Sequence, residues 1–281
     1  MSRNLVARIA VAAIAIPIIL WICYQGGWWL FGMVLLFAVL AMGEFLVGEG
    51  YGPTSTTFWL CLMAVVLMVW QSAALNLYGG VIEGYLDLMT LPIVALVFLF
   101  AGMAFAVGKE PPSDLFTRHS RLIWGVLYVG MLYPYVFRVG QGTINIDGGD
   151  ALLFLFGVLW LGDTAAMFVG SQFGRHKLAP AVSPNKTIEG FIGGIIGAIV
   201  VAVIMGYWKL TEVGWGHLIV LAIGASIFGQ LGDLVESMWK RSRGIKDSSA
   251  IIPGHGGVLD RFDSLLFAAP FLYLYTTWMR L

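Results

Sequence analysis

Long apolar runs alternate with short polar segments along the whole chain. A helix needs about 20 mostly apolar residues to cross a bilayer, and nine runs reach that length. They predict spanning helices over residues 5–24, 27–47, 57–76, 88–107, 121–139, 150–170, 188–208, 215–238 and 262–279. The expected fold class is therefore all-α, a polytopic integral membrane protein.

The amino-acid composition agrees with this pattern. Of the 281 residues 59% are hydrophobic and 11% are charged, whereas a soluble domain carries about 25% charged residues. This small number of charges cannot cover a water-facing surface. Part of the protein surface must therefore face the lipid bilayer. The net charge of zero argues against a nucleic-acid partner. Cys23 and Cys61 lie in separate apolar runs and share no metal-ligand or disulfide spacing.

The basic residues predict an orientation, since Lys and Arg are enriched in cytoplasmic loops. With a cytoplasmic N-terminus and nine helices, the opposite side receives Arg138, Lys209 and Arg280 alone. The cytoplasmic side receives thirteen, namely Arg3, Arg8, Lys109, Arg118, Arg121, Arg175, Lys177, Lys186, Lys240, Arg241, Arg243, Lys246 and Arg261. This asymmetry favours a cytoplasmic N-terminus and an odd number of helices.

The two halves of the chain differ in character. Residues 1–110 are apolar, with acidic residues such as Glu44 and Glu49 near helix ends, and they carry no motif. From Asp163 onward polar residues and glycines become frequent, so residues 111–281 are expected to hold the catalytic region of one continuous membrane domain. No inverted or parallel repeat is visible, which argues against a transporter.

The eighth predicted helix carries a polar face. Asp233, Glu236, Ser237 and Lys240 follow the spacing i, i+3, i+4, i+7, which places them on one side of a helix. A buried charge in a spanning helix costs roughly 2.5–3.5 kcal/mol on insertion scales. Either this face is an interfacial helix end with a Glu–Lys pair, or it binds a cation and a substrate.

The loop after this helix ends in a second acidic group. Asp260 and Asp263 are three residues apart at the start of the ninth helix, and oxygen-only carboxylate clusters suit Mg²⁺. Ahead of them, Gly256 and Gly257 would let the backbone approach a ligand and direct its amides at phosphate oxygens. Taken alone, Asp260 also fits a helix N-cap and Arg261 a headgroup anchor.

These residues form a pattern with fixed spacing. Ser237-x-x-Lys240-Arg241-x4-Lys246-Asp247, followed by His255-Gly256-Gly257-x-x-Asp260-Arg261-x-Asp263, resembles the C-terminal pattern of phosphatidate cytidylyltransferases, also called CDP-diacylglycerol synthases. One departure is Trp239, where the family has an aliphatic residue. Trp239 lies between the polar positions of the helix, so we expect it to face lipid or packing and to leave the chemistry intact.

A second stretch strengthens the resemblance. Ser183-Pro184-Asn185-Lys186-Thr187-Ile188-Glu189-Gly190 is similar to the segment that precedes the seventh helix in this family. Ser183 followed by Pro184 also fits a helix N-cap and first turn. In the functional interpretation, Lys186 and nearby backbone amides bind phosphate at the N-terminus of the seventh predicted helix, which is its positive end.

Two further features lie within helices. The spacings Gly190/Gly194 and Gly193/Gly197 predict close packing of the seventh helix against a neighbour. Asp163 lies inside the sixth helix, where an ionisable residue is a site candidate by default. It either contacts metal or substrate, or bonds to Thr164 or another helix.

The resemblance implies that phosphatidic acid, entering from the cytoplasmic leaflet, attacks the α-phosphorus of CTP to give CDP-diacylglycerol and pyrophosphate. Metal ligands are expected at Asp233, Asp260 and Asp263, with Asp163 as a further candidate for Mg²⁺, and the family allows a second cation such as K⁺. The catalytic candidates are Asp233, Lys240, Arg241, Lys246, Asp247, His255, Asp260 and Asp263. The substrate-binding candidates are Ser183, Lys186, Glu236, Ser237, Gly256, Gly257 and Arg261.

Several alternatives stay open at this point. A CTP-dependent lipid kinase would transfer the γ-phosphoryl group and release CDP, and a cation or phosphate transporter would turn over no CTP. An ether-linked archaeal lipid is an equally good acceptor on sequence grounds. The expected location is a prokaryotic inner membrane with the site facing the cytoplasm. A homodimer is compatible with the sequence.

Overall fold

The computed structural model describes residues 3–77, 112–252 and 256–281. Its helices are α1 (Arg3–Gln25), α2 (Gly27–Gly48), α3 (Thr56–Leu77), α5 (Pro112–Val139), α6 (Gly148–Phe173), α7 (Ile188–Trp208), α8 (Trp215–Ser242) and α9 (Leu259–Met279). Two short strands, β1 (Lys177–Ala179) and β2 (Ser183–Thr187), lie between α6 and α7.

Each predicted run within the described residues coincides with one of these helices. The predicted helix over 88–107 and the proposed boundary at residue 110 lie outside the described residues. Six of the described helices, α2, α3, α5, α6, α7 and α8, are long and apolar enough to cross a membrane. The chain is therefore an integral membrane protein, while the total of nine spans remains a prediction.

The expectation of an all-α fold is wrong in one segment, because β1 and β2 form an antiparallel hairpin. Lys177 pairs with Thr187, and Ala179 pairs with Ser183. The interpretation of Ser183 as a helix cap is therefore also wrong. Thr187 caps α7 instead, because its backbone is extended and its side chain accepts a hydrogen bond from the Gly190 amide at 3.1 Å.

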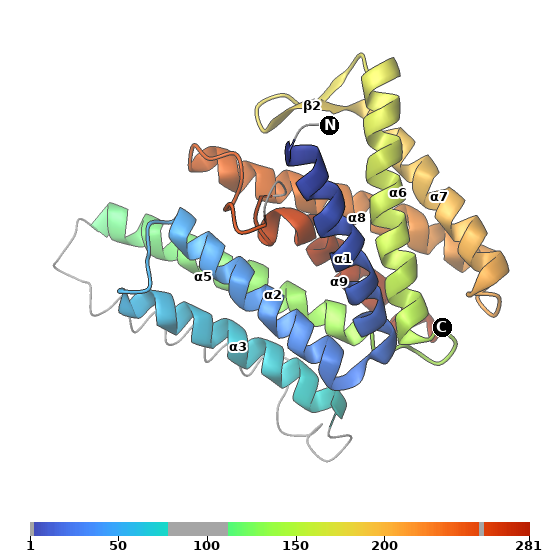
Figure 1. Cartoon of the computed structure of the whole chain (residues 1–281), viewed down its shortest axis with the longest axis horizontal. Helices are drawn as coiled ribbons and strands as arrows, with labels where there is room; N and C mark the ends of the chain where they lie inside the picture. Colours follow the sequence, from blue (N-terminus) through green and yellow to red (C-terminus); the bar gives the residue numbers. More distant parts are fainter. Residues whose placement is uncertain (1–2, 78–111, 253–255) are drawn as a thin grey trace.

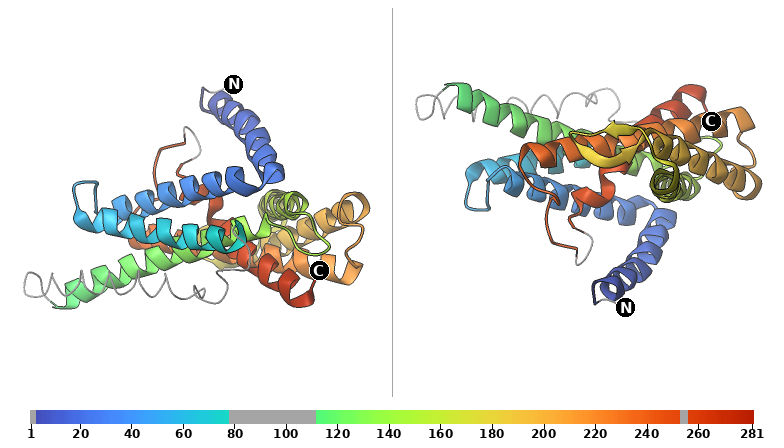
Figure 2. Two further views of the ribbon diagram at one scale, coloured as in Figure 1. Left: turned by 90° about the horizontal axis from the view of Figure 1, so that it is seen from below. Right: turned by 90° about the horizontal axis from the view of Figure 1, so that it is seen from above.

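The helices form two groups joined by α9 (Figure 1). One group contains α2, α3 and α5, and the other contains α6, α7 and α8. Helix α9 contacts α8 and α6 on one side, and α5 and α2 on the other. The residues at the start of α9 can therefore meet side chains from both groups. Helix α1 contacts α2 and α6, and its N-terminal half stands out from the other helices (Figure 2).

Helix α7 has two distinct faces. Its glycines face α6, where a Cβ on Gly197 would lie 2.8 Å from the Ala165 Cβ and 3.0 Å from the Leu161 carbonyl oxygen. Close packing by the glycine spacings is thus confirmed. The exposed face carries Ile192 and Ile196, which suit contact with lipid tails.

Gly197→Ala should destabilise the protein, since the new methyl group meets a backbone carbonyl of α6 that cannot turn away. Overpacking of this kind costs about 1–3 kcal/mol, visible as a lower thermal unfolding temperature in detergent. The matched control is Gly32→Ala on α2, where a Cβ meets nothing within 4 Å. Equal stability of the two variants would contradict the close approach of α6 and α7.

Candidate active site

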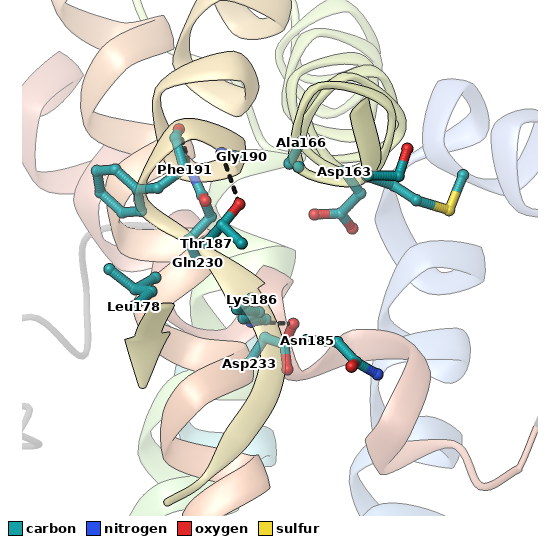
Figure 3. Close-up of a pocket in the computed structure, with 13 residues that line it drawn as sticks. Asp163, Ala166, Leu178, Asn185, Lys186, Thr187, Gly190, Phe191, Gln230 and Asp233 are labelled. Carbon is teal, nitrogen blue, oxygen red and sulfur yellow. Dashed lines mark hydrogen bonds and ion pairs between the residues drawn. The ribbon is translucent and has the colours of Figure 1, made fainter. Parts of the chain in front are cut away.

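A cavity of about 500 Å³ lies where the hairpin meets α6, α7 and α8. Its polar lining includes Asp163 from α6, Lys186 from β2 and Asp233 from α8 (Figure 3). Its apolar lining includes Ala166 and Met167. Small-molecule sites occupy roughly 300–1,000 Å³, so the cavity is large enough for a ligand with a polar head and an apolar part.

Lys186 and Asp233 form an ion pair within this cavity (Figure 3). The Lys186 Nζ lies 2.5 Å from Asp233 Oδ2, and the Ser237 hydroxyl donates to Asp233 Oδ1 at 3.2 Å. Both side chains of the ion pair keep some exposure, 27% for Lys186 and 33% for Asp233. A ligand entering the cavity would therefore meet one cation and one anion that already neutralise each other.

A second group of charges lies deeper, between α8 and α9. We call Glu236, Lys240, Asp260 and Asp263 the carboxylate–lysine cluster. Lys240 Nζ pairs with Glu236 Oε2 and donates to Asp260 Oδ1 at 2.7 Å. The pairing of Lys240 with Glu236 confirms that the predicted polar face of α8 is one side of a helix.

Asp260 is the most strongly bonded carboxylate of the cluster. Besides Lys240, its Oδ2 accepts from the amide and hydroxyl of Ser248, both at 2.9 Å, and from the Gly257 amide at 2.8 Å. Burial alone would raise the pKa of Asp260, but the hydrogen bonds from Lys240 and Gly257 outweigh it and lower that pKa to about 2. Asp260 is thus ionised at neutral pH, and the Gly257 amide is directed at Asp260.

The cluster brings three carboxyl groups together with one ammonium group. Glu236 is fully buried and pairs with Lys240, and Asp263 is 8% exposed. Glu236 Oε1 has no hydrogen-bond partner within the described part of the chain. The charges of Asp263, Asp233 and Asp163 also act on one another, which links the cluster to the cavity. Buried carboxylates without partners need protons or a cation.

Other predicted site residues lie around these two centres. Arg241 is exposed and donates to the carbonyl oxygens of Val182 and Ile245 at 3.2 and 3.0 Å. Lys246, Asp247 and Arg261 are exposed. Ser183 is half-buried in β2, and Gly256 has a positive φ of 80° with its carbonyl bonded to the Ile252 amide. His255 lies outside the described residues.

Sequence reasoning missed two contributors to the site. Gln230 lines the cavity, and its amide nitrogen donates to the Phe191 carbonyl and the Ser226 hydroxyl. Glu44, on a helix interpreted as scaffold, is buried and contacts the loop before α9. The available signal was an acidic residue within a spanning helix, which is a site candidate by default. Trp239 is expected from the sequence either to face lipid or to pack inside the protein. It is buried and stacks on Phe45, which confirms the packing role.

The fold and this site define an integral membrane protein with an anionic, lysine-containing centre beside an open cavity. The chain belongs to the Cytidylyltransferase family, whose sequence profile matches residues 6–279. This match confirms the resemblance carried by the two motif stretches.

Three similar proteins are named phosphatidate cytidylyltransferase. The protein of Staphylococcus haemolyticus (strain JCSC1435) is 36% identical over 266 residues, which cover 94% of this chain and 96% of the relative. That of Staphylococcus epidermidis (strain ATCC 35984) is 35% identical over 271 residues, with the same coverage. That of Bacillus subtilis (strain 168) is 46% identical over 149 residues, covering 52% of this chain and 54% of the relative.

Lys240→Met should strongly destabilise the fold, because it leaves Glu236 and Asp260 buried without their cation. Removing one partner of a buried ion pair lowers the free energy of unfolding by about 3–5 kcal/mol. The loss is measurable as a lower thermal unfolding temperature in detergent. Lys246→Met removes an exposed lysine from the nearby loop and serves as the control. If both variants unfold at the wild-type temperature, Lys240 does not neutralise the cluster.

Proposed function

We propose that this chain transfers the cytidylyl group of CTP to phosphatidic acid, giving CDP-diacylglycerol and pyrophosphate. The observation that carries the proposal is the Lys186–Asp233 pair in an open cavity beside a buried carboxylate–lysine cluster, in a chain of the Cytidylyltransferase family. The names of the relatives support phosphatidate as the acceptor.

In this reaction a phosphate oxygen of phosphatidic acid attacks the α-phosphorus of CTP. The bond from that phosphorus to the oxygen bridging the β-phosphate breaks, and pyrophosphate leaves with its electrons. Such transfers depend on positioning and charge neutralisation more than on covalent help from the protein. Lys186 can turn from Asp233 to a phosphate, while Arg241 and Lys246 lie exposed nearby to bind the triphosphate.

The residues of the site fit a divalent cation. The cluster sets three carboxyl groups against one ammonium group, and Glu236 Oε1 is buried with no hydrogen-bond partner among the residues that the structure describes. Within the described ranges no group of three His, Cys, Asp or Glu side chains forms a metal site by itself, so substrate phosphates or water would complete the ligand set, as Mg²⁺ prefers. Bound Mg²⁺ would neutralise the phosphates and the leaving pyrophosphate.

We propose Asp233 and Asp263 as the first protein ligands, because they lie where α8 packs against the start of α9, with Asp163 as a further candidate because it lines the same cavity as Asp233. Asp260 is also a predicted ligand, but both its oxygens are bonded. It would have to exchange Lys240 for the cation. A second, monovalent cation such as K⁺ is compatible with the remaining surplus charge.

The cavity suits a lipid phosphate. Charged groups line one part, whereas Met167, which is 71% exposed, lies on the α6 surface beside Ala166. A phosphatidate headgroup can reach Lys186 while its acyl chains stay in the bilayer. We further propose a cytoplasmic N-terminus and a site facing the cytoplasm, from the basic residues, and a bacterial inner membrane, from the bacterial relatives.

Purified protein given CTP, phosphatidate and Mg²⁺ should release pyrophosphate and form CDP-diacylglycerol, followed with CTP labelled at the α- and γ-phosphates. Asp263→Asn should lower turnover by about a hundredfold or more, because it removes charge from the proposed metal site. The control is Glu212→Gln, an exposed carboxylate at the other end of α8. Release of CDP would identify a lipid kinase, and full activity of Asp263→Asn would exclude Asp263 from the metal site.

The orientation has its own test in vesicles. Glu212 precedes α8 and Lys246 follows it, so the two positions lie on opposite sides of a spanning helix. Glu212→Cys should react with a membrane-impermeant maleimide from outside intact cells, and Lys246→Cys only in inverted vesicles. Buried Cys23 and Cys61 should contribute little background. The reverse labelling pattern would overturn the proposed orientation.

A further inference from the structure

Glu44 is a buried carboxylate on α2, 4% exposed, that accepts four hydrogen bonds from the segment between α8 and α9. Its Oε1 accepts from the Ser249 hydroxyl at 2.6 Å and the Val258 amide at 2.9 Å. Its Oε2 accepts from the Ser248 hydroxyl at 3.0 Å and the Leu259 amide at 2.9 Å. Each oxygen therefore receives one bond from each end of the loop.

The Glu44 contacts act directly on the start of α9. The Val258 and Leu259 amides belong to the first turn, whose amides have no partner within the helix, and a carboxylate is favourable there. Asp260 follows one residue later, and Ser248 bonds to both Glu44 and Asp260. The position of Glu44 thus sets where Asp260 and, one turn on, Asp263 meet α8.

The loop passes very close to Glu44 at Gly257. A Cβ on Gly257 would lie 2.0 Å from the Ser248 hydroxyl oxygen and 2.5 Å from Glu44 Oε2. Gly257 is therefore required for the backbone to pass close to this carboxylate. Gly257, the second residue of the predicted glycine pair, thus allows the Glu44 side chain of α2 to reach the loop.

We propose that Glu44 is a positioning residue for the reaction, holding the first turn of α9 so that Asp260 and Asp263 stay in register with Lys240 and Asp233. This inference rests on the proposed function, because its effect is read as cytidylyl transfer. It adds a residue from the N-terminal helices that touches neither substrate nor the reacting atoms.

The requirement is for a carboxylate, because all four partners of Glu44 donate. Glu44→Gln keeps the size of the side chain but turns an amide N–H₂ toward donors, which removes two bonds and adds repulsion. Glu44→Asp keeps the charge on a shorter side chain. Ser249→Ala removes one donor to Glu44, together with the acceptor of the Ile251 amide, and serves if Glu44→Gln does not fold.

The matched control is Glu49→Gln. Glu49 lies just past the same helix end and its side chain is 4% exposed, but its partners are Arg121, Trp239 and the α8 C-cap Arg243, and not Ser248, Ser249 or the first turn of α9. Both variants remove one buried carboxylate from this part of the chain. A purely structural role for Glu44 would make the two behave alike.

For Glu44→Gln we expect kcat for pyrophosphate release to fall by about 10–100-fold, as for other residues that orient metal ligands, with the KM for CTP nearly unchanged. Hydrogen exchange of the Val258 and Leu259 amides should accelerate. In Glu49→Gln both readouts should stay near wild type, while Glu44→Asp should lie between.

Wild-type turnover separates the two proposals. If wild type is inactive, the proposed function fails, whereas faster exchange at Val258 and Leu259 in Glu44→Gln alone would still show the capping contact. If wild type is active and Glu44→Gln, or Ser249→Ala in its place, keeps wild-type kcat and exchange, the positioning role is overturned. An equal loss of kcat in Glu49→Gln would overturn it as well.

Discussion

The site depends on a shortage of positive charge in the protein interior. Lys240 is the ammonium shared by buried Glu236 and Asp260, with Asp263 close by. Burying unpaired charge costs several kcal/mol, so this arrangement persists only if hydrogen bonds and a further cation or protons satisfy the carboxylates. The loop supplies the hydrogen bonds through Ser248 and Gly257. The excess of carboxyl groups over ammonium groups in the cluster supports the metal site that we propose.

The two centres of the site have different physical properties. The Lys186–Asp233 pair lines an open cavity and keeps partial exposure, so a phosphate can compete for Lys186 at little cost in desolvation. The deeper cluster is mostly buried and is built from α8 and α9. Lys186 is accessible to a substrate phosphate, and the carboxylates of the cluster are buried beside it. This combination suits the nucleotidyl transfer that we propose, because such reactions depend on preorganised charge.

Helix α9 makes this geometry possible. It packs against α8 and α6 on one side and α5 and α2 on the other, so the first turn is accessible to residues far apart in the chain. Glu44 and Asp260 are 216 residues apart in sequence, yet Ser248 bonds to both. The division into scaffold and catalytic halves is therefore a description of sequence composition. It is not a boundary within the site.

Hydrophobic run length alone predicted the described helices, because a bilayer demands about 20 apolar residues per span and leaves little choice of secondary structure. Helical spacing likewise predicted the polar face of Asp233, Glu236 and Lys240. Only the tertiary structure determined the hairpin of β1 and β2, the deep pairing of Lys240 with Asp260, and the hydrogen bonds of Glu44. The hairpin depends on pairing across a short turn, and the other two features depend on contacts between separate helices and the loop before α9, so helical periodicity carries no signal for any of them.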